Sequence, residues 1–217
     1  MPCYVTRDAA IFALQKMRIF YQELEALYVR NELNIKADIG RRNILMSSLQ
    51  EKYFAEGISQ AFPGTVANGK TGEPDIIVAG LNRELECKLT SRNRSGSWAL
   101  QSDYNTLRRK GAVDHLYALA SDDFNEFAVL FFEGLTIDDF RPPAPGSKGK
   151  SRINFSKAIH KSTVIVGNME DKSLKYTAAA IEVLENPASS RFSRGTAKER
   201  LEYWRNRSRI SFNLETI

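Results

Sequence analysis

Two carboxylates and one lysine are spaced along the chain in a pattern that suits metal-assisted hydrolysis. Asp75 directly precedes a short apolar run at 76–78, which predicts a strand. Polar and apolar side chains alternate over 84–89, the period of a second strand. If the two strands pair as a β-hairpin, Asp75 and Glu86 come together, and Lys88 lies on the same face as Glu86.

These three residue types point to a Mg²⁺ site with a cation beside it. Mg²⁺ keeps several waters and binds through one or two carboxylates together with phosphate oxygens of a substrate. Asp75 and Glu86 are therefore the predicted metal ligands, and we expect Mn²⁺ to substitute. Lys88 would position a metal-bound water or share in stabilising the developing charge. A structural alternative stays open, in which Glu86 and Lys88 pair on a solvated strand and Asp75 is a turn residue.

A further carboxylate, Glu51, lies at an unusual position on a predicted helix over 43–62. At about 100° per residue, the apolar positions of this helix form one stripe, and Glu51 lies in the middle of it. The stripe consists of Ile44, Phe54, Ala55, Ile58 and Phe62. Glu56 projects from the opposite side and is expected to be exposed. A buried, ionised glutamate is costly unless it is paired or metal-bound, so Glu51 is either the partner of an arginine or a site residue.

The motif residues resemble the PD-(D/E)XK nuclease superfamily: Pro74-Asp75, ten residues, then Glu86-Cys87-Lys88. The resemblance covers roughly residues 43–132, and Cys87 is expected to point to the core. It implies an α/β fold with a restriction-endonuclease-like core, in which a central mixed β-sheet is flanked by helices. Many members carry an additional metal-associated glutamate on the preceding helix, and Glu51 matches that position. Glu84 competes weakly with Glu86, but its spacing from Lys88 departs from the motif.

Other elements surround this core. An apolar stripe predicts a long amphipathic helix over 8–30, which packs on the chain's own core or forms a dimer seam. A polar helix is expected over 99–110, followed by buried strands at 115–120 and 127–132. The proline-rich segment 141–146 excludes helix and central strand and marks a boundary.

The boundary divides the chain into three regions. Residues 1–42 supply the N-terminal helix, 43–140 the catalytic core, and 141–217 an appended basic C-terminal region that packs on the same domain. Within the last region we expect a flexible basic loop at 148–152, a strand at 162–166, helices at 176–185 and 196–205, and a terminal strand at 207–214.

Charge is distributed unevenly between these regions. Residues 1–145 carry 17 Lys and Arg against 19 Asp and Glu, whereas residues 146–217 carry 14 against 7, giving net charges of −2 and +7. Such a division is typical of a protein that binds a polyanion with its basic part and carries carboxylates for chemistry in another part. The alternative is a solvated basic surface with no partner. The predicted DNA-binding residues are Arg92, Arg94, Arg108, Arg109, Lys110, Lys148, Lys150, Arg152, Arg191, Arg194, Lys198, Arg205, Arg207 and Arg209.

Composition excludes several classes of protein. With 217 residues the chain can bury a sizeable core without disulfides, so Cys3 and Cys87 are not expected to be staples. His115 and His160 are the only histidines, too few for a three-histidine metal site, and both are expected to be structural. Two cysteines without a C-x-x-C pair, and no apolar run near membrane-spanning length, predict a cytoplasmic protein with no membrane span.

The resemblance implies a Mg²⁺-dependent, sequence-specific endodeoxyribonuclease, most like a type II restriction endonuclease, that leaves 5′-phosphates. Double-stranded DNA is the expected partner. A homodimer is expected because one core carries one strand-cutting centre, whereas cleavage of both strands at a palindrome needs two. A companion DNA methyltransferase is a further expected partner. Two alternatives remain: a structure-selective or repair nuclease of the same superfamily, and a non-catalytic DNA-binding protein.

Overall fold

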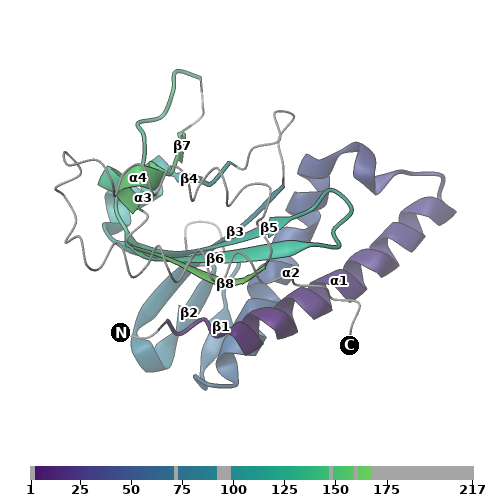
Figure 1. The fold of residues 1–217 in the computed structure, drawn as a ribbon, viewed down its shortest axis with the longest axis horizontal. Helices are drawn as coiled ribbons and strands as arrows, with labels where there is room; N and C mark the ends of the chain where they lie inside the picture. Colours follow the sequence, from purple (N-terminus) through teal and green to yellow (C-terminus); the bar gives the residue numbers. More distant parts are fainter. Residues whose placement is uncertain (1–2, 71–72, 92–98, 147–148, 159–160, 168–217) are drawn as a thin grey trace.

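The computed structural model describes residues 3–70, 73–91, 99–146, 149–158 and 161–167 (Figure 1). The helices in this part of the chain are α1 (Arg7–Arg30), η1 (Ile35–Ala37), α2 (Ile39–Ser59), η2 (Ala79–Leu81), α3 (Tyr104–Lys110), η3 (Ile137–Asp139) and α4 (Phe155–Ala158), where η marks a 3-10 turn. The strands are β1 (Thr65–Ala67), β2 (Ile76–Val78), β3 (Arg83–Ser91), β4 (Gln101–Asp103), β5 (Val113–Ala120), β6 (Phe127–Leu135), β7 (Lys150–Arg152) and β8 (Ser162–Gly167).

Within the described residues, the strands form a mixed six-stranded sheet in the order β1-β2-β3-β5-β6-β8 and a separate two-stranded sheet of β4 and β7. β1, β2 and β3 make an antiparallel meander. The chain then passes through α3 into β5, which runs parallel to β3. β6 and β8 continue the sheet in antiparallel pairing. The predicted α/β class with a mixed central sheet is confirmed.

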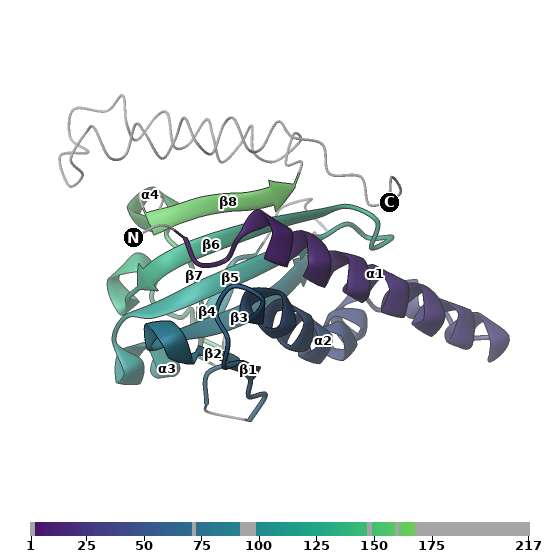
Figure 2. The same ribbon diagram turned by 90° about the horizontal axis from the view of Figure 1, so that it is seen from below.

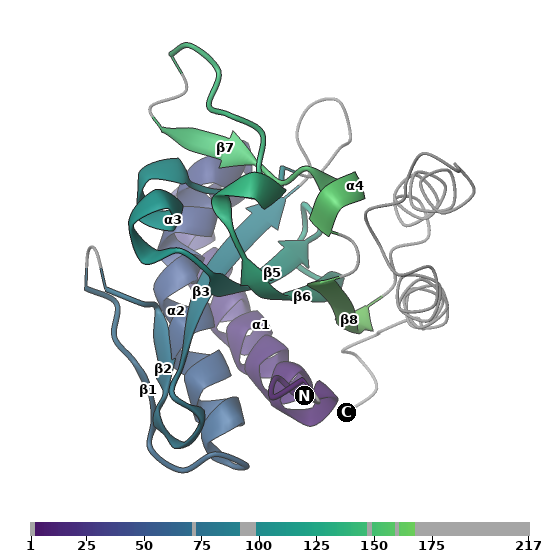
Figure 3. The same cartoon turned by 90° about the vertical axis from the view of Figure 1, so that its left-hand side faces the viewer.

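Each face of the central sheet carries its own apolar core. On one face, α1 and α2 pack against β-strand residues such as Leu85, Cys87 and Leu116 (Figure 2). On the other face, where α3 and β7 lie (Figure 3), Tyr117 and Leu130 share a core with Leu107 of α3 and with Leu100 and Ile153, which adjoin β4 and β7. Because side chains alternate along a strand, neighbouring residues of β3 are committed to opposite faces.

The predicted helix over 8–30 is α1, and its apolar stripe packs on the chain's own core. Thr6 caps its N-terminus by accepting a hydrogen bond from the Ala9 backbone N–H, at 3.1 Å. Ala13 and Met17 are fully buried against the core. α1 also approaches α2 closely, because a Cβ added at Gly57 would lie 2.7 Å from the Ala9 carbonyl oxygen.

The predicted helix over 43–62 is α2, but the apolar stripe is wrong at its N-terminal end. α2 begins at Ile39, and Ile44 is 74% exposed. The core-facing side of the first turns of α2 carries Arg42 and Met46, which are both 0% exposed, and Ile44, two residues from each, projects from the opposite side of the helix. Phe54 and Ile58, near the sheet, are buried, and Glu56 is exposed as predicted.

Arg42 fixes the start of α2 to the sheet, a role that the sequence does not reveal. Its side chain is fully buried, and its guanidinium donates hydrogen bonds to the Ser91 hydroxyl at the end of β3 and to the Asp122 carbonyl, both at 2.5 Å. The guanidinium carbon also lies 5.1 Å from the centre of the Phe124 ring. Burial lowers the pKa of Arg42. These contacts hold α2 in a fixed position along β3.

The predicted hairpin is confirmed as β2, η2 and β3. Ile76 lies opposite Leu85, and Val78 lies opposite Arg83. Asn82 closes the turn in the left-handed conformation, with φ of 49°, which asparagine adopts more readily than most residues.

Three short strands were not expected. β1 lies in the glycine-rich stretch after α2, and β4 occupies part of the segment 99–110 predicted as a helix. Only Tyr104–Lys110 is helical, because Asp103 caps α3 by accepting a hydrogen bond from the Thr106 N–H. The predicted flexible loop at 148–152 is also wrong for Lys150–Arg152, which pair with β4 as strand β7. Strands of three residues are too short to show a period in sequence.

The strands predicted at 115–120, 127–132 and 162–166 are confirmed as β5, β6 and β8, and the segment 141–146 contains neither helix nor strand. β8 belongs to the same sheet as the predicted catalytic strands. The predicted helices at 176–185 and 196–205 and the terminal strand at 207–214 lie outside the described residues.

Candidate active site

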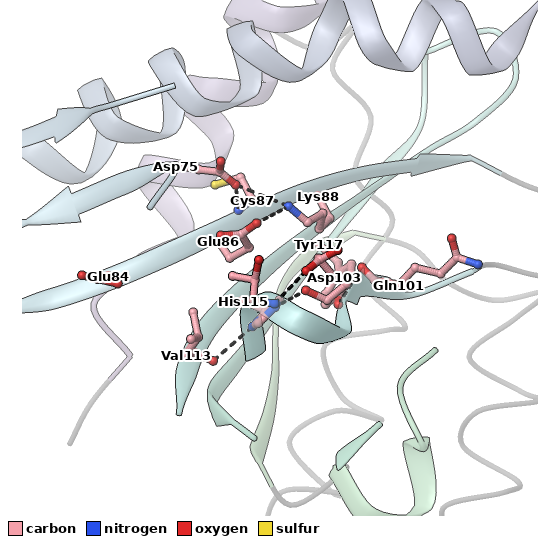
Figure 4. A network of polar contacts seen from close by, with 12 residues as sticks. Asp75, Glu84, Glu86, Cys87, Lys88, Gln101, Asp103, Val113, His115 and Tyr117 are labelled. Carbon is pink, nitrogen blue, oxygen red and sulfur yellow. Dashed lines mark hydrogen bonds and ion pairs between the residues drawn. The ribbon is translucent and has the colours of Figure 1, made fainter. Parts of the chain in front are cut away.

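Asp75, Glu86 and Lys88 meet at the start of β2, at the end away from the turn into β3, beside the middle of β3 (Figure 4). The Lys88 Nζ lies 2.5 Å from Glu86 Oε1 and 3.5 Å from Asp75 Oδ2. Asp75 Oδ2 also accepts a hydrogen bond of 2.7 Å from the backbone N–H of Cys87. The structure therefore brings the three motif residues together, with the ammonium group within reach of both carboxylates.

Strand alternation explains this arrangement. Leu85 and Cys87 are buried in the core beneath the helices, so Glu86 and Lys88 must point the other way. Asp75 immediately precedes Ile76, whose partner on β3 is Leu85, and this register brings Asp75 level with the Glu86-to-Lys88 segment. Cys87 faces the core as predicted, and burial raises the pKa of its thiol well above the ordinary value.

Partial burial and the nearby charges change the pKa values of Asp75 and Lys88. Burial raises the pKa of Asp75, and the Lys88 ammonium opposes this shift without cancelling it. Burial alone would lower the pKa of Lys88, but the Glu86 and Asp75 carboxylates outweigh it and raise that pKa. Lys88 is therefore charged at neutral pH, while the Asp75 carboxylate lies where negative charge is costly.

Glu51 lies on α2 at the side of this cluster. Burial, reinforced by the Asp75 carboxylate, raises the pKa of Glu51 to about 7, against the lowering effect of Lys88. Its Oε2 lies 3.4 Å from the point where a Cβ of Gly69 would be. Within the described part of the chain, Glu51 makes no ion pair with an arginine or lysine. The structure thus places Glu51 in the electrostatic field of the motif carboxylates.

The oxygen donors of this site suit a hard divalent cation. Asp75 Oδ1 and Glu86 Oε2 accept no hydrogen bond from any described residue, so each carboxylate keeps an oxygen that could bind a cation. No group of three or more His, Cys, Asp and Glu side chains in the described residues is arranged to hold a metal ion. Two carboxylates with retained waters are a common Mg²⁺ arrangement, so the donor set fits Mg²⁺.

Glu84 does not join the site, although it alternates in step with Glu86. Its side chain is 52% exposed and pairs with Lys110 at 3.2 Å. Figure 4 shows it apart from the Asp75 and Lys88 side chains.

His115 is a buried structural residue beside Glu86, its register partner on β5. Its Nδ1 lies 3.0 Å from the Val113 carbonyl and its Nε2 lies 2.9 Å from the Ser102 hydroxyl. A carbonyl can only accept, so Nδ1 carries the proton, and Ser102 donates to Nε2. Burial lowers the pKa of His115 to about 4. The ring is therefore neutral at physiological pH. His160 lies outside the described residues.

Gln50 is a neighbour of the site that the sequence did not single out. It is fully buried on α2, next to Glu51, and its Nε2 donates to the Lys88 backbone carbonyl at 3.4 Å. Its Oε1 has no hydrogen-bond partner among the described residues. A glutamine on a helix carries no pattern that would have marked it.

The predicted DNA-binding residues are placed only in part. Arg108 and Arg109 are exposed on the last turn of α3, and Lys150 and Arg152 are exposed on β7. Lys110 is engaged by Glu84. The remainder lie outside the described residues: Arg92, Arg94, Lys148, Arg191, Arg194, Lys198, Arg205, Arg207 and Arg209.

No protein-family model matches the chain, and no curated protein matches it in sequence. In the described residues, no helix combines the length and the apolar character needed to cross a bilayer.

Proposed function

We propose that this protein is a Mg²⁺-dependent endodeoxyribonuclease that hydrolyses phosphodiester bonds in double-stranded DNA. The observation that carries the proposal is the contact of one ammonium group, Lys88, with two carboxylates, Asp75 and Glu86, on adjacent strands. In the finer form of the proposal, cleavage is sequence-specific, as in a type II restriction endonuclease.

The order of elements supports a restriction-endonuclease-like core. Helix α2 is followed by the antiparallel meander β1-β2-β3, then by α3, and then by β5 parallel to β3. This is the helix, meander, helix and strand order that the resemblance to the PD-(D/E)XK superfamily implies. The motif residues lie at the start of β2 and on β3, within that core.

Each site residue has a distinct role in the proposal. Asp75 and Glu86 would hold Mg²⁺ through their oxygens that accept no hydrogen bond from the described residues. When bound, Mg²⁺ supplies an activated water and stabilises negative charge on the phosphate. Lys88 would orient the attacking water through its ammonium protons and share in stabilising the charge. Glu51, whose pKa lies near neutrality, would hold or release a proton at its carboxylate beside the site.

A homodimer is part of the proposal. The described part of the chain carries one such site, and cleavage of both strands at a two-fold symmetric sequence needs two sites related by the same symmetry. A companion DNA methyltransferase would then protect the host's own sites.

The test is incubation of the purified full-length chain with phage-length DNA, with Mg²⁺ and with EDTA. Discrete fragments that require Mg²⁺ support a sequence-specific enzyme. A smear supports a nuclease without sequence specificity, and cleavage limited to branched or damaged DNA supports a structure-selective enzyme. Binding without cleavage in Mg²⁺ or Mn²⁺ would reject the nuclease and leave a DNA-binding protein.

A further inference from the structure

The two-stranded sheet of β4 and β7, called here the β4–β7 ribbon, is anchored beside the catalytic strand. Ser102 of β4 donates to His115, the register partner of Glu86. The Tyr117 hydroxyl donates to the Gln101 carbonyl at 3.2 Å, and Tyr117 is the register partner of Lys88. Figure 4 shows His115 and Tyr117 of β5 next to the Glu86 and Lys88 side chains. The ribbon is thus tied to the sheet at the level of Glu86 and Lys88.

The two faces of the ribbon differ in chemistry. Ser102 and its partner Ser151 are 5% and 3% exposed and face the sheet. Lys150 and Arg152 lie on either side of Ser151, so they point to the opposite face, and both are exposed. Within the described residues neither of them forms an ion pair. The outward carboxylate of Asp103 caps α3 instead, accepting from the Thr106 N–H at 2.7 Å.

More positive charge adjoins this face. Exposed Arg141 donates its backbone N–H to the Arg152 carbonyl at 2.9 Å, which places it next to the ribbon. The Tyr104 N–H at the start of α3 donates to the Gly149 carbonyl, so the helix bearing Arg108 and Arg109 is joined to the ribbon as well. Cations that form no ion pair with any described carboxylate, on a surface next to the proposed phosphodiester-cleaving site, suit a polyanionic backbone.

We propose that the outward face of the β4–β7 ribbon binds the sugar–phosphate backbone of duplex DNA and aligns it with the site at Glu86 and Lys88. This inference rests on the proposed function and deepens it, because it assigns the surface that holds the substrate. The hydrogen bonds of Ser102 and Tyr117 fix the distance between the phosphate-binding cations and the motif residues. Lys150 and Arg152 contact phosphates and make no contact with base edges.

The test compares two double variants that each remove two exposed positive charges. The first is Lys150→Gln with Arg152→Gln. The second, as the control, is Lys16→Gln with Arg30→Gln on α1, which covers the opposite face of the sheet. The affinity of the full-length proteins for a fluorescein-labelled DNA duplex is measured by anisotropy in EDTA, over a series of salt concentrations. Cleavage in Mg²⁺ is measured separately.

Each phosphate contact contributes about −0.9 to the slope of log affinity against log salt. The ribbon variant should therefore bind more weakly, with a slope shallower by about 1.8, while the control keeps the wild-type slope. Equal slopes in all three proteins, or equal losses in both variants, would overturn the inference. If the ribbon variant has a shallower slope but the wild type cleaves no DNA, the proposed nuclease function is rejected and the DNA-binding surface is retained. If the wild type cleaves DNA but the slope of the ribbon variant is unchanged, the DNA-binding role of the ribbon alone is rejected.

Discussion

The carboxylate of Asp75 accepts a hydrogen bond from the backbone N–H of Cys87, so it is anchored between the two other motif residues on β3. This bond and the 3.5 Å contact with Lys88 use the same oxygen, Oδ2, and leave Oδ1 without a protein hydrogen bond in the described part of the chain. A carboxylate that is fixed at one oxygen and open at the other is well prepared to hold a cation, since little conformational entropy remains to be lost.

Replacing Asp75 by asparagine should remove Mg²⁺ binding without unfolding the protein. The amide oxygen can still accept from Cys87, while the charge that burial disfavours is gone. In EDTA the melting temperature of Asp75→Asn should equal or exceed that of the wild type. Mg²⁺ titration by calorimetry should show binding to the wild type and none to the variant. Unchanged Mg²⁺ affinity in the variant would remove Asp75 from the metal site.

Lys88→Ala should separate metal binding from catalysis. The variant loses the ammonium group near both carboxylates, so their mutual repulsion increases and Mg²⁺ should raise its melting temperature more than that of the wild type. Its cleavage rate should fall by about 100-fold or more, as when a charge-stabilising donor is removed. Lys52→Ala, an exposed residue of α2, serves as the control. Wild-type cleavage by Lys88→Ala would show that Lys88 takes no part in the reaction.

Glu51→Gln should slow cleavage and change the pH dependence of stability in the absence of metal. The folded protein raises the pKa of Glu51 from 4.5 to about 7, so its contribution to stability is present below pH 4.5 and is lost as the pH rises through 7. In EDTA, the free energy of unfolding of Glu51→Gln should therefore rise relative to that of the wild type as the pH rises from 4.5 to 8. Urea unfolding measures this difference. A variant that unfolds readily at pH 8 and cleaves normally per folded molecule would identify Glu51 as a structural residue.

His115 should make the fold sensitive to acid. Its pKa is lowered from 6.5 to about 4 in the folded protein, so the stability it contributes is present above pH 6.5 and is lost as the pH falls through 4. The loss corresponds to about 3 kcal/mol over this interval. In denaturant unfolding, the difference in free energy between wild type and His115→Gln should shrink by that amount from pH 7 to pH 4. A constant difference would contradict the buried neutral imidazole.

Gly57→Ala should destabilise the fold although alanine favours helices. The added Cβ would lie 2.7 Å from the backbone oxygen of Ala9, so α1 and α2 must move apart. We expect a loss of about 1–3 kcal/mol in the free energy of unfolding, as for other overpacked sites. Gly80→Ala, where no neighbouring atom lies within 4 Å of the added Cβ, is the matched control. Equal effects of the two substitutions would contradict the close helix contact.

Sequence patterning predicted the elements whose period is long enough to recognise. The hairpin that joins Asp75 to Glu86 followed from the alternation over 84–89, and α1 followed from a stripe that is continuous over many turns. β1, β4 and β7 have three residues each and could not be predicted, because their conformation depends on pairing with distant partners.

The candidate site was predictable to a similar extent. The motif spacing placed Asp75, Glu86 and Lys88 together, and the odd position of Glu51 marked it correctly as a neighbour. The exposure of Ile44 and the burial of Arg42 show the limit of helical periodicity, because tertiary packing places the arginine on the core side of the helix and leaves the isoleucine on the solvent side. Gln50 contacts β3, and Ser102 contacts His115. Both are tertiary contacts that no local sequence pattern predicts.

The most direct test of the central claim is a single-turnover cleavage assay on duplex DNA with the wild type, Asp75→Asn and Glu86→Gln. The account predicts that the wild type cuts in Mg²⁺, leaves 5′-phosphate ends and stops in EDTA. Both variants should be slower by at least about 100-fold while remaining folded, because each weakens the hold on an ion that contributes several kcal/mol. Failure of the wild type to cut in Mg²⁺ or Mn²⁺, or cutting by both variants at the wild-type rate, would contradict it.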